Sequence, residues 1–269
     1  MADNFKPMYW SKKIETDLKT DMVMCNWCDY SYDGEIKYGN RLKIIGAVKP
    51  TIVDYAKGTP LTPENLGDNS QYLDIDRAKA FCYGLDDVDK AQSMPEFHNA
   101  ELEQAKEALA EEAETYVGTL AQKALTSMKS ASTEITKTNA LEVIGDALIK
   151  LYKNKVTAKT PLAADLNAKH IMKAKEAMNS LFTENVDYVK NGAVGKYGNV
   201  YLRLATCLYN DGTDDYEMIR TKRAIAFANA IDKVTKSDNT YGFGVIVKGL
   251  HVYGAKVIRP KELAVILAH

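Results

Sequence analysis

The stretch that decides the fold covers residues 96–128 and reads EFHNAELEQAKEALAEEAETYVGTLAQKALTSM. Its apolar side chains recur at steps of three and four residues, which places them on one face of an α-helix. They are Leu102, Ala105, Leu109, Ala113, Tyr116, Leu120 and Ala124. Glu and Lys fill the opposite face, so the pattern predicts one amphipathic helix of roughly 30 residues, about 45 Å long. Globular helices average about 11–12 residues, which makes this one unusually long.

The segment before this helix has the pattern of a long β-hairpin. Alternation in residues 36–56 predicts a strand, with Leu42, Ile44, Gly46 and Val48 on one face and Arg41, Lys43, Ile45, Ala47 and Lys49 on the other. Residues 58–69, GTPLTPENLGDN, carry the prolines and glycines of a turn. Residues 71–85 alternate again. A two-stranded hairpin is marginal in isolation, so we expect it to lie on another surface.

The N-terminal 35 residues mix charges and aromatic side chains and have few periodic apolar positions. They predict an extended arm with one short helical stretch near residues 12–18. Such a segment gains little by packing on its own body, so a neighbouring molecule would be needed to order it.

The rest of the chain mixes both kinds of secondary structure. Apolar spacing predicts helices over residues 139–154 and 163–182, the second from Leu166, Met178 and Leu181. Strands are predicted within residues 191–208, 216–230, 241–258 and 263–267. The chain is therefore expected to be α+β, and to form one unit with an arm and a projecting hairpin.

Composition limits the possible functions. The 269 residues are 46% hydrophobic, enough for a sizeable core, and the formal net charge is -1. A near-neutral chain is a poor candidate for tight sequence-independent DNA binding, which depends on many cations. No signal peptide and no apolar run near the roughly 20 residues of a membrane span are present. We therefore expect synthesis in the cytoplasm, no membrane association, and four cysteines that remain free thiols.

The motifs that could carry chemistry are weak. Cys25-Asn-Trp-Cys28 has the spacing of a metal or redox pair, but a zinc site needs about four ligands, and Cys82 and Cys207 stand alone. The aspartates at positions 74, 76, 86, 87 and 89 lack the spacing of a calcium loop. The glycine-rich residues 191–198 lack a phosphate-loop pattern and predict a reverse turn. No catalytic motif is present, and we expect neither a cofactor nor enzymatic activity.

Four segments, in order, resemble the major capsid proteins of tailed bacteriophages, which have the Hong Kong 97-type capsid fold. YLDIDRAKAFCYGLDDVDKAQ at residues 72–92 is similar to a family run "L-x-I-D … F … D-D-V-D-x-A-Q". NGAVG at residues 191–195 and KRAIAFA at residues 222–228 resemble the family's "NG-x-IG" turn and "AI-x-FA" strand. GLHVYGAKVIRP at residues 249–260 is close to its "GL-x-x-YGAKV-x-x-P" ending. Their order and spacing match the family over roughly residues 35–265.

The resemblance implies a division of the chain. Residues 1–35 would be the N-terminal arm and residues 36–85 the extended loop that lies over a neighbouring subunit. Residues 86–135 and 221–269 would form the peripheral domain with its spine helix, and residues 136–220 the axial domain. One departure is that many members have a "V-x-x-P" strand-to-helix step before the apical turn. His170-Ile-Met-Lys-Ala-Lys-Glu has no proline, so the helix predicted there would begin later, after a short strand.

The implied function is structural: a subunit that assembles with copies of itself, as pentamers and hexamers, into the icosahedral head of a virion. Portal and scaffolding proteins would be partners, and packaged DNA would be held without sequence-specific binding. Two alternatives stay open, an encapsulin-like compartment shell and a small cytosolic metal-binding protein or enzyme. The residues expected at subunit contacts are Trp10, Trp27, Arg41, Lys43, Lys49, Tyr55, Leu61, Leu66 and Tyr72.

Overall fold

The computed structural model describes residues 22–33, 41–46, 50–54, 57, 70–86, 95–177, 193–239, 242 and 244–269. The helical stretch predicted near residues 12–18 lies outside these ranges, as does the whole of the predicted turn at residues 58–69. Within the described part, no helix combines the length and the apolar character needed to cross a membrane.

The long helix is present and shorter than predicted. Helix α3 spans Pro95–Thr119, and two 3₁₀ turns follow it at Leu120–Lys123 and Thr126–Met128. The prediction of one continuous helix to residue 128 is therefore wrong. Ala124 has extended dihedral angles and interrupts the helix. Leu120, Ala121 and Met128 are still buried. The spacing of apolar side chains therefore continues through the 3₁₀ turns, and the sequence pattern cannot distinguish a 3₁₀ turn from an α-helix.

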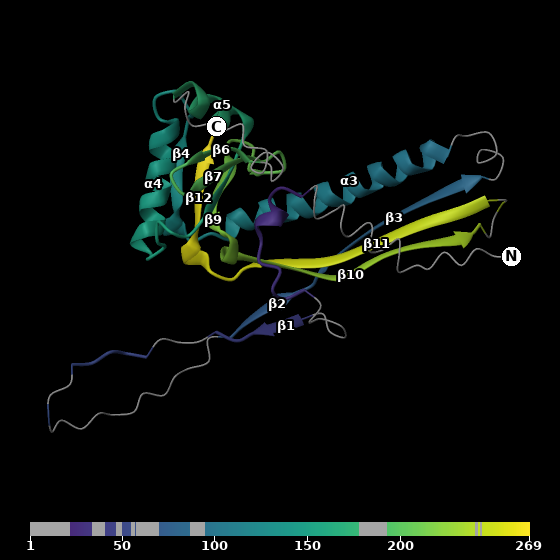
Figure 1. The fold of residues 1–269 in the computed structure, drawn as a ribbon, viewed down its shortest axis with the longest axis horizontal. Helices are drawn as coiled ribbons and strands as arrows, with labels where there is room; N and C mark the ends of the chain where they lie inside the picture. The colour runs from purple at the N-terminus through teal and green to yellow at the C-terminus, as the bar shows by residue number, and fades with distance from the viewer. Residues whose placement is uncertain are drawn as a thin grey trace.

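Helix α3 lies along a three-stranded antiparallel sheet (Figure 1). The sheet has the order β10–β11–β3, with β3 at Arg77–Asp86, β10 at Ile225–Asp238 and β11 at Gly244–Val257. Buried side chains from both layers form one core, including Leu109, Ala113, Val117, Phe227 and Tyr253. The strand predicted at residues 216–230 is two strands. The 3₁₀ turn Lys222–Ala224 separates β9 (Asp215–Thr221) from β10 and passes the chain from one sheet to the other.

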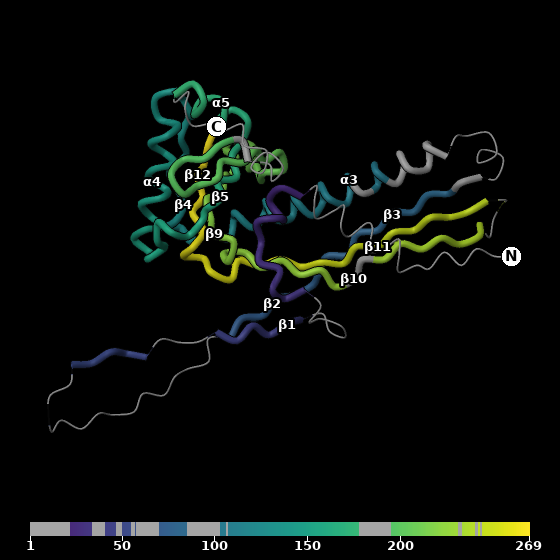
Figure 2. Tube along the Cα trace, viewed as in Figure 1, coloured from purple at the N-terminus to yellow at the C-terminus, as the bar shows by residue number. Residues whose placement is uncertain are grey.

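A mixed seven-stranded sheet forms the second body. Its order is β4–β12–β9–β5–β7–β6, and β8 pairs with β9. The strands are β4 (Lys129–Thr133), β5 (Leu162–Leu166), β6 (Ala193–Tyr197), β7 (Val200–Leu204), β8 (Tyr209–Asn210), β9 (Asp215–Thr221) and β12 (Leu263–Ala268). β12 pairs parallel with β4 and β5 pairs parallel with β7, while the other pairs are antiparallel. Figure 2 traces the last strand of the chain into the interior of this sheet.

Two helices cover one face of the seven-stranded sheet, α4 (Ala140–Lys153) and α5 (Ala168–Ala177). The helix predicted over residues 163–182 was wrong at its start, because residues 162–166 form β5. All five β5 residues are buried, and a short apolar run buried on both faces has no helical or strand period to read. The side chain of Asn167 then accepts a hydrogen bond from the His170 backbone N–H at 2.6 Å and begins α5. The missing proline had pointed to this order of strand and helix.

Both faces of the central strands are buried, so two cores share one sheet. In β12, Leu263 and Val265 belong to the core beneath α3, while Ala264, Ile266 and Ala268 belong to the core beneath α4 and α5. β9 does the same with Met218 and Ile219. Successive side chains of a strand point to opposite faces of the sheet. The same strands therefore contribute to both cores and join the two bodies.

The predicted hairpin is confirmed near its base. β1 (Arg41–Ile44) pairs antiparallel with β2 (Gln71–Asp74), and the pair projects from the body (Figure 1). The predicted strands are too long, because residues 50–54 are not strand and β3 leaves the hairpin to pair with β11. Ile44, Leu73 and Ile75 pack with Ala226 and Ala228 in a third, small core that holds the hairpin base on β10.

Candidate subunit-assembly site

The contact residues expected from the sequence fall in three places. Arg41, Lys43 and Tyr72 lie on exposed positions of the β1–β2 hairpin. Trp27 lies in the 3₁₀ turn η1 (Cys25–Trp27), against the seven-stranded sheet. Trp10, Lys49, Tyr55, Leu61 and Leu66 lie outside the described residues. The structure therefore brings together the three hairpin residues and separates Trp27 from them.

The hairpin has one buried face and carries exposed apolar side chains elsewhere. Leu73 is fully buried, whereas Ile45 is 81% exposed and Tyr72 is 44% exposed. Farther out, Ile52 is 90% exposed and Val53 is 58% exposed. Large aliphatic side chains lose the free energy of burial when they stay in water. Several on one projection are typical of a surface covered by a partner.

Polar contacts fix the base of the hairpin. Arg41 pairs with Asp74 across the ladder, and its guanidinium lies over the Tyr72 ring at 5.2 Å. Lys256 Nζ donates to the Tyr72 carbonyl at 2.7 Å, and Gln71 Nε2 donates to the Ile258 carbonyl at 3.1 Å. The hairpin is thus attached to β11 at a defined place, which fixes the direction in which it leaves the body.

Three of the four family-like segments meet at this base. Ile225–Ala228 of β10 pair in register with Gly254–Val257 of β11, and residues 73–75 pack against them. Gly254 is required there, because a Cβ would lie 2.9 Å from the Cα of Ile75 and closer still to the Asp74 carbonyl oxygen. Only a residue without a side chain allows this approach.

A buried ionic cluster holds residues 22–28 on the body, and the sequence patterns did not predict it. Asp165 of β5 pairs with Arg203 of β7 and with Arg220 of β9, the second at 3.2 Å. All three side chains are at most 2% exposed. Arg203 Nη1 donates to the Val23 carbonyl at 2.6 Å. Arg220 donates to the Trp27 and Met24 carbonyls at 2.6 and 2.8 Å.

Glu114 of α3 holds the same segment from the other side. Its carboxylate accepts hydrogen bonds from the backbone N–H groups of Met24 and Cys25, at 2.9 and 3.3 Å. Burial raises the pKa of Glu114 to about 7, although these two donors act in the opposite direction. The segment is therefore held by carbonyls on cations and by N–H groups on an anion, so that its backbone polarity is satisfied inside the protein.

One aromatic and one cationic side chain pack against Trp27 and account for its position. Its ring lies 5.7 Å from the Tyr201 ring and 5.5 Å from the Arg203 guanidinium. Cys25 and Cys28 are buried free thiols, and burial raises the pKa of both, that of Cys28 to about 11. They are held as packed, protonated side chains. In the described part of the chain, no three His, Cys, Asp or Glu residues gather as metal ligands.

The candidate calcium cluster does not form as a group. Asp74 pairs with Arg41, and Asp76 lies beside Arg77 and the Tyr116 hydroxyl. Asp86 ends β3, nine residues from Arg77, which is about 30 Å along an extended strand. Asp87 and Asp89 lie outside the described residues.

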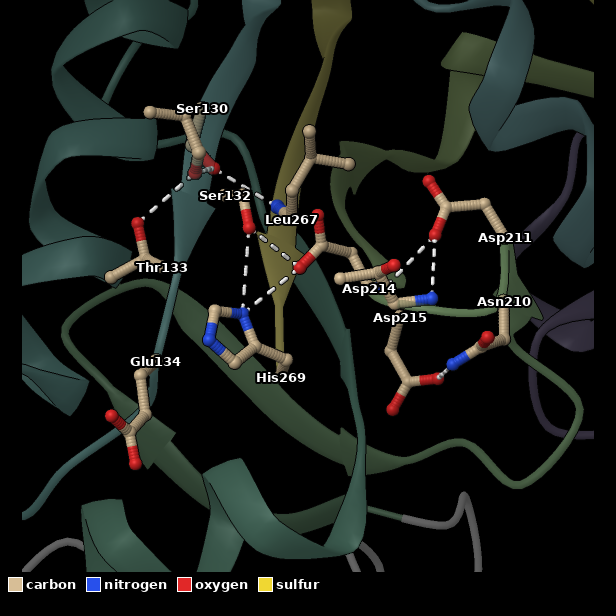
Figure 3. Close-up of polar contacts among 12 residues, drawn as sticks. Ser130, Ser132, Thr133, Glu134, Asn210, Asp211, Asp214, Asp215, Leu267 and His269 are labelled. Carbon is tan, nitrogen blue, oxygen red and sulfur yellow. Dashed lines mark hydrogen bonds and ion pairs between the residues drawn. The ribbon is translucent and has the colours of Figure 1, made fainter.

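One group of side chains has the composition of a catalytic triad but not its geometry. Figure 3 shows Ser132, Asp214 and His269 joined by hydrogen bonds at the end of β12. Asp214 Oδ1 lies 3.0 Å from His269 Nδ1, and Ser132 Oγ lies 3.4 Å from the same nitrogen. A triad needs its acid on one ring nitrogen and its nucleophile on the other. Ser132 also donates to Asp214 at 2.8 Å, so the three form a structural network.

Comparisons with known proteins identify the fold. No protein-family model and no curated protein matches the chain. A solved structure of Mycobacterium phage Che8 matches with a TM-score of 0.71 and 23% identity, over 91% of this chain and 90% of that one. The capsid of Cyanophage P-SCSP1u matches with a TM-score of 0.70 and 16% identity, over 87% and 85%. A virus-like particle from Pyrococcus furiosus matches with a TM-score of 0.58 and 11% identity, over 95% and 96%.

The chain therefore has the mixed α/β fold of phage capsid proteins over nearly its whole length. The resemblance inferred from the sequence is confirmed at the level of the fold. The signal that carried it was not the amphipathic pattern alone but the ordered segments at the hairpin base, where the structure brings residues 73–75, β10 and β11 together.

Proposed function

We propose that this chain is the major capsid subunit of a tailed phage, a structural protein that assembles with its own copies into the icosahedral head around double-stranded DNA. The observation that carries the proposal is the projecting hairpin, on which Ile45 and Ile52 are exposed. The chain that bears this hairpin has the fold of phage capsids. A monomer leaves these side chains in water. A shell of overlapping subunits covers them.

The proposed parts follow from this function. Residues 1–35 are the arm and residues 36–85 the extended loop over a neighbour. α3 is the spine helix of a peripheral domain made of residues 86–135 and 221–269, and residues 136–220 are an axial domain around five- and six-fold centres. Many modest contacts acting together stabilise such a lattice, and closed symmetry limits its growth. Trp10, Trp27, Arg41, Lys43, Lys49, Tyr55, Leu61, Leu66 and Tyr72 remain the proposed contact residues.

The surroundings of the shell also follow. A net charge of -1 lets copies pack closely and lets the wall enclose DNA without gripping it. Portal and scaffolding proteins are the further partners we propose, and the mature location is the virion capsid after synthesis in the host cytoplasm. No cofactor and no enzymatic step belong to this function.

Expression of the chain, alone and with a scaffolding protein, tests the proposal. We expect large regular particles by electron microscopy and light scattering. Only monomers, across salt and protein concentrations, would overturn it. The content of particles from the native source separates the proposal from a compartment shell: DNA supports the capsid subunit, and a protein cargo without DNA supports the compartment.

A further inference from the structure

A groove opens between helix α3 and the connection from β7 to β8. It has a volume of about 330 Å³ and is lined by Glu107, Glu111, Val23, Leu204 and Thr206, among others. Its deepest carboxylate, Glu114, already binds the backbone of residues 24 and 25. The groove therefore combines an apolar lining with negative charge at its mouth.

Among the described residues, no cation compensates the two outer carboxylates of the groove. Glu107 and Glu111 are both exposed and lie one turn apart on α3, where like charges repel. Within the described residues, neither forms an ion pair with a cation. Leu204, at the edge of the groove, is 38% exposed. A cationic side chain on an apolar stem would satisfy both features.

The end of helix α4 presents that chemistry on another part of the molecule. Lys153 and Lys155 are exposed, and within the described part of the chain neither has a carboxylate partner. Beside them, Ile149 is 50% exposed and Tyr152 is 39% exposed. The end of α4 is thus a basic and apolar projection, complementary in both respects to the groove.

Capping of α4 does not explain why a lysine stands at position 155, where the backbone is left-handed. Lys155 N–H donates to the Tyr152 carbonyl and Val156 N–H donates to the Leu151 carbonyl, at 2.9 and 3.2 Å. This is a Schellman ending, in which the left-handed position is usually glycine. Lys155 has φ 67° there and is the one described non-glycine residue with a positive φ. Lys150 and Lys153 already place positive charge in the last turn, so the helix dipole does not require another lysine.

The two surfaces belong to opposite sides of the seven-stranded sheet. α4 packs in the core on one face. Ala110 and Ala205, which line the groove, belong to the core on the other face. A contact between different surfaces of two copies is head-to-tail, and such contacts close into rings when the rotation permits.

We infer that the end of α4, with Lys153 and Lys155, docks into the Glu107–Glu111 groove of an adjacent copy of this chain and joins subunits within a ring. The inference rests on the proposed shell function and names a contact within it. It also gives a role to Lys155, where a lysine occupies a position that favours glycine.

Charge reversal at either surface tests the contact. We expect Glu107→Lys with Glu111→Lys, and separately Lys153→Glu with Lys155→Glu, to lower particle yield about tenfold or more. The four substitutions together should restore much of the yield, because the pairing is reversed and not removed. Lys137→Glu with Lys222→Glu is the matched control, since it changes two exposed lysines elsewhere. Particle yield is measured by sedimentation and electron microscopy.

A second variant separates docking from folding. Lys155→Gly relieves the left-handed backbone, so we expect the unassembled subunit to melt about 2–4 °C higher and yet to give fewer particles. Unchanged particle yield in Lys155→Gly and in both reversed variants overturns the docking contact alone. A wild-type chain that never assembles overturns the proposed function, and this inference with it.

Discussion

Gly254 of β11 faces the Asp74 carbonyl of β2 so closely that a Cβ on Gly254 would lie within 3.0 Å of that oxygen and of Ile75 Cα. Both neighbours are backbone atoms, so neither yields as the end of a flexible side chain would. Gly254→Ala should therefore destabilise the subunit by about 1–3 kcal/mol. Gly84→Ala is the control, because a Cβ at Gly84 meets nothing within 4 Å. Denaturant unfolding of the two variants checks this, and equal stabilities would contradict the proposed crossing of hairpin and sheet.

Removal of the shared carboxylate in the ionic cluster should have a larger effect. Asp165→Asn leaves the buried guanidiniums of Arg203 and Arg220 without their counter-ion, at a cost of about 3–5 kcal/mol. The matched control is Asp74→Asn, which removes an exposed partner of Arg41, a change worth about 0–1 kcal/mol. Hydrogen exchange of residues 22–28 should rise in Asp165→Asn and stay unchanged in the control. A similar loss of stability in both variants would mean that burial of the pair is unimportant.

The features that the sequence predicted depend on residues close together in the chain, whereas those that it missed depend on residues far apart. The amphipathic face of α3 and the alternation of β1 and β2 are set by neighbouring residues, and both elements were recovered. β5 was read as helix, because all five of its residues are buried. The ionic cluster joins positions 165, 203 and 220, and only their strands bring them together. The available signal was Asp165, a charged residue inside the apolar strand LAADL. It indicates a buried ion pair but does not identify the arginines that complete it.

A second buried pair should make stability depend on pH. His170 Nε2 lies 2.9 Å from the Ala140 carbonyl, which can only accept, and Nδ1 lies 2.5 Å from Glu217 Oε2. Burial opposes the charged imidazole, but the hydrogen bond and charge of Glu217 dominate and raise the pKa of His170 above its usual 6.5. Burial also raises the pKa of Glu217. The folded pair thus holds a proton more tightly than the unfolded chain does.

The sign of the pH effect follows from that excess of bound protons. Stability from His170 is fully present below pH 6.5 and is lost as pH rises through the raised pKa, with a slope of at most about 1.4 kcal/mol per pH unit. Glu114 acts in the same direction, because its pKa is also raised: its contribution is lost as pH rises from the usual 4.5 toward about 7. Denaturant unfolding of the unassembled subunit between pH 5 and 9 measures the slope. His170→Gln should reduce it, Glu114→Gln should reduce a separate part of it, and a slope unchanged in both would contradict this assignment.

The exposed hairpin should matter for assembly and not for folding. Ile52 is 90% exposed and Ile45 is 81% exposed, so Ile52→Asp or Ile45→Asp should change the stability of the unassembled subunit by less than about 0.5 kcal/mol. In a shell, the same change places a charge where an apolar side chain is covered. Burial of an isoleucine is worth about 1.5–3 kcal/mol, so the protein concentration needed for assembly should rise about tenfold or more.

A conservative change separates the chemistry of the hairpin from its shape. Ile52→Val keeps an apolar side chain and should assemble close to the wild-type concentration, while Ile52→Asp should not. Light scattering across a concentration series gives the threshold for each variant, and melting of the unassembled subunit shows that both are folded. If Ile52→Asp and Ile45→Asp both assemble at the wild-type threshold, the hairpin is not covered by a neighbour. The proposed overlap of subunits would then have to be made by another surface.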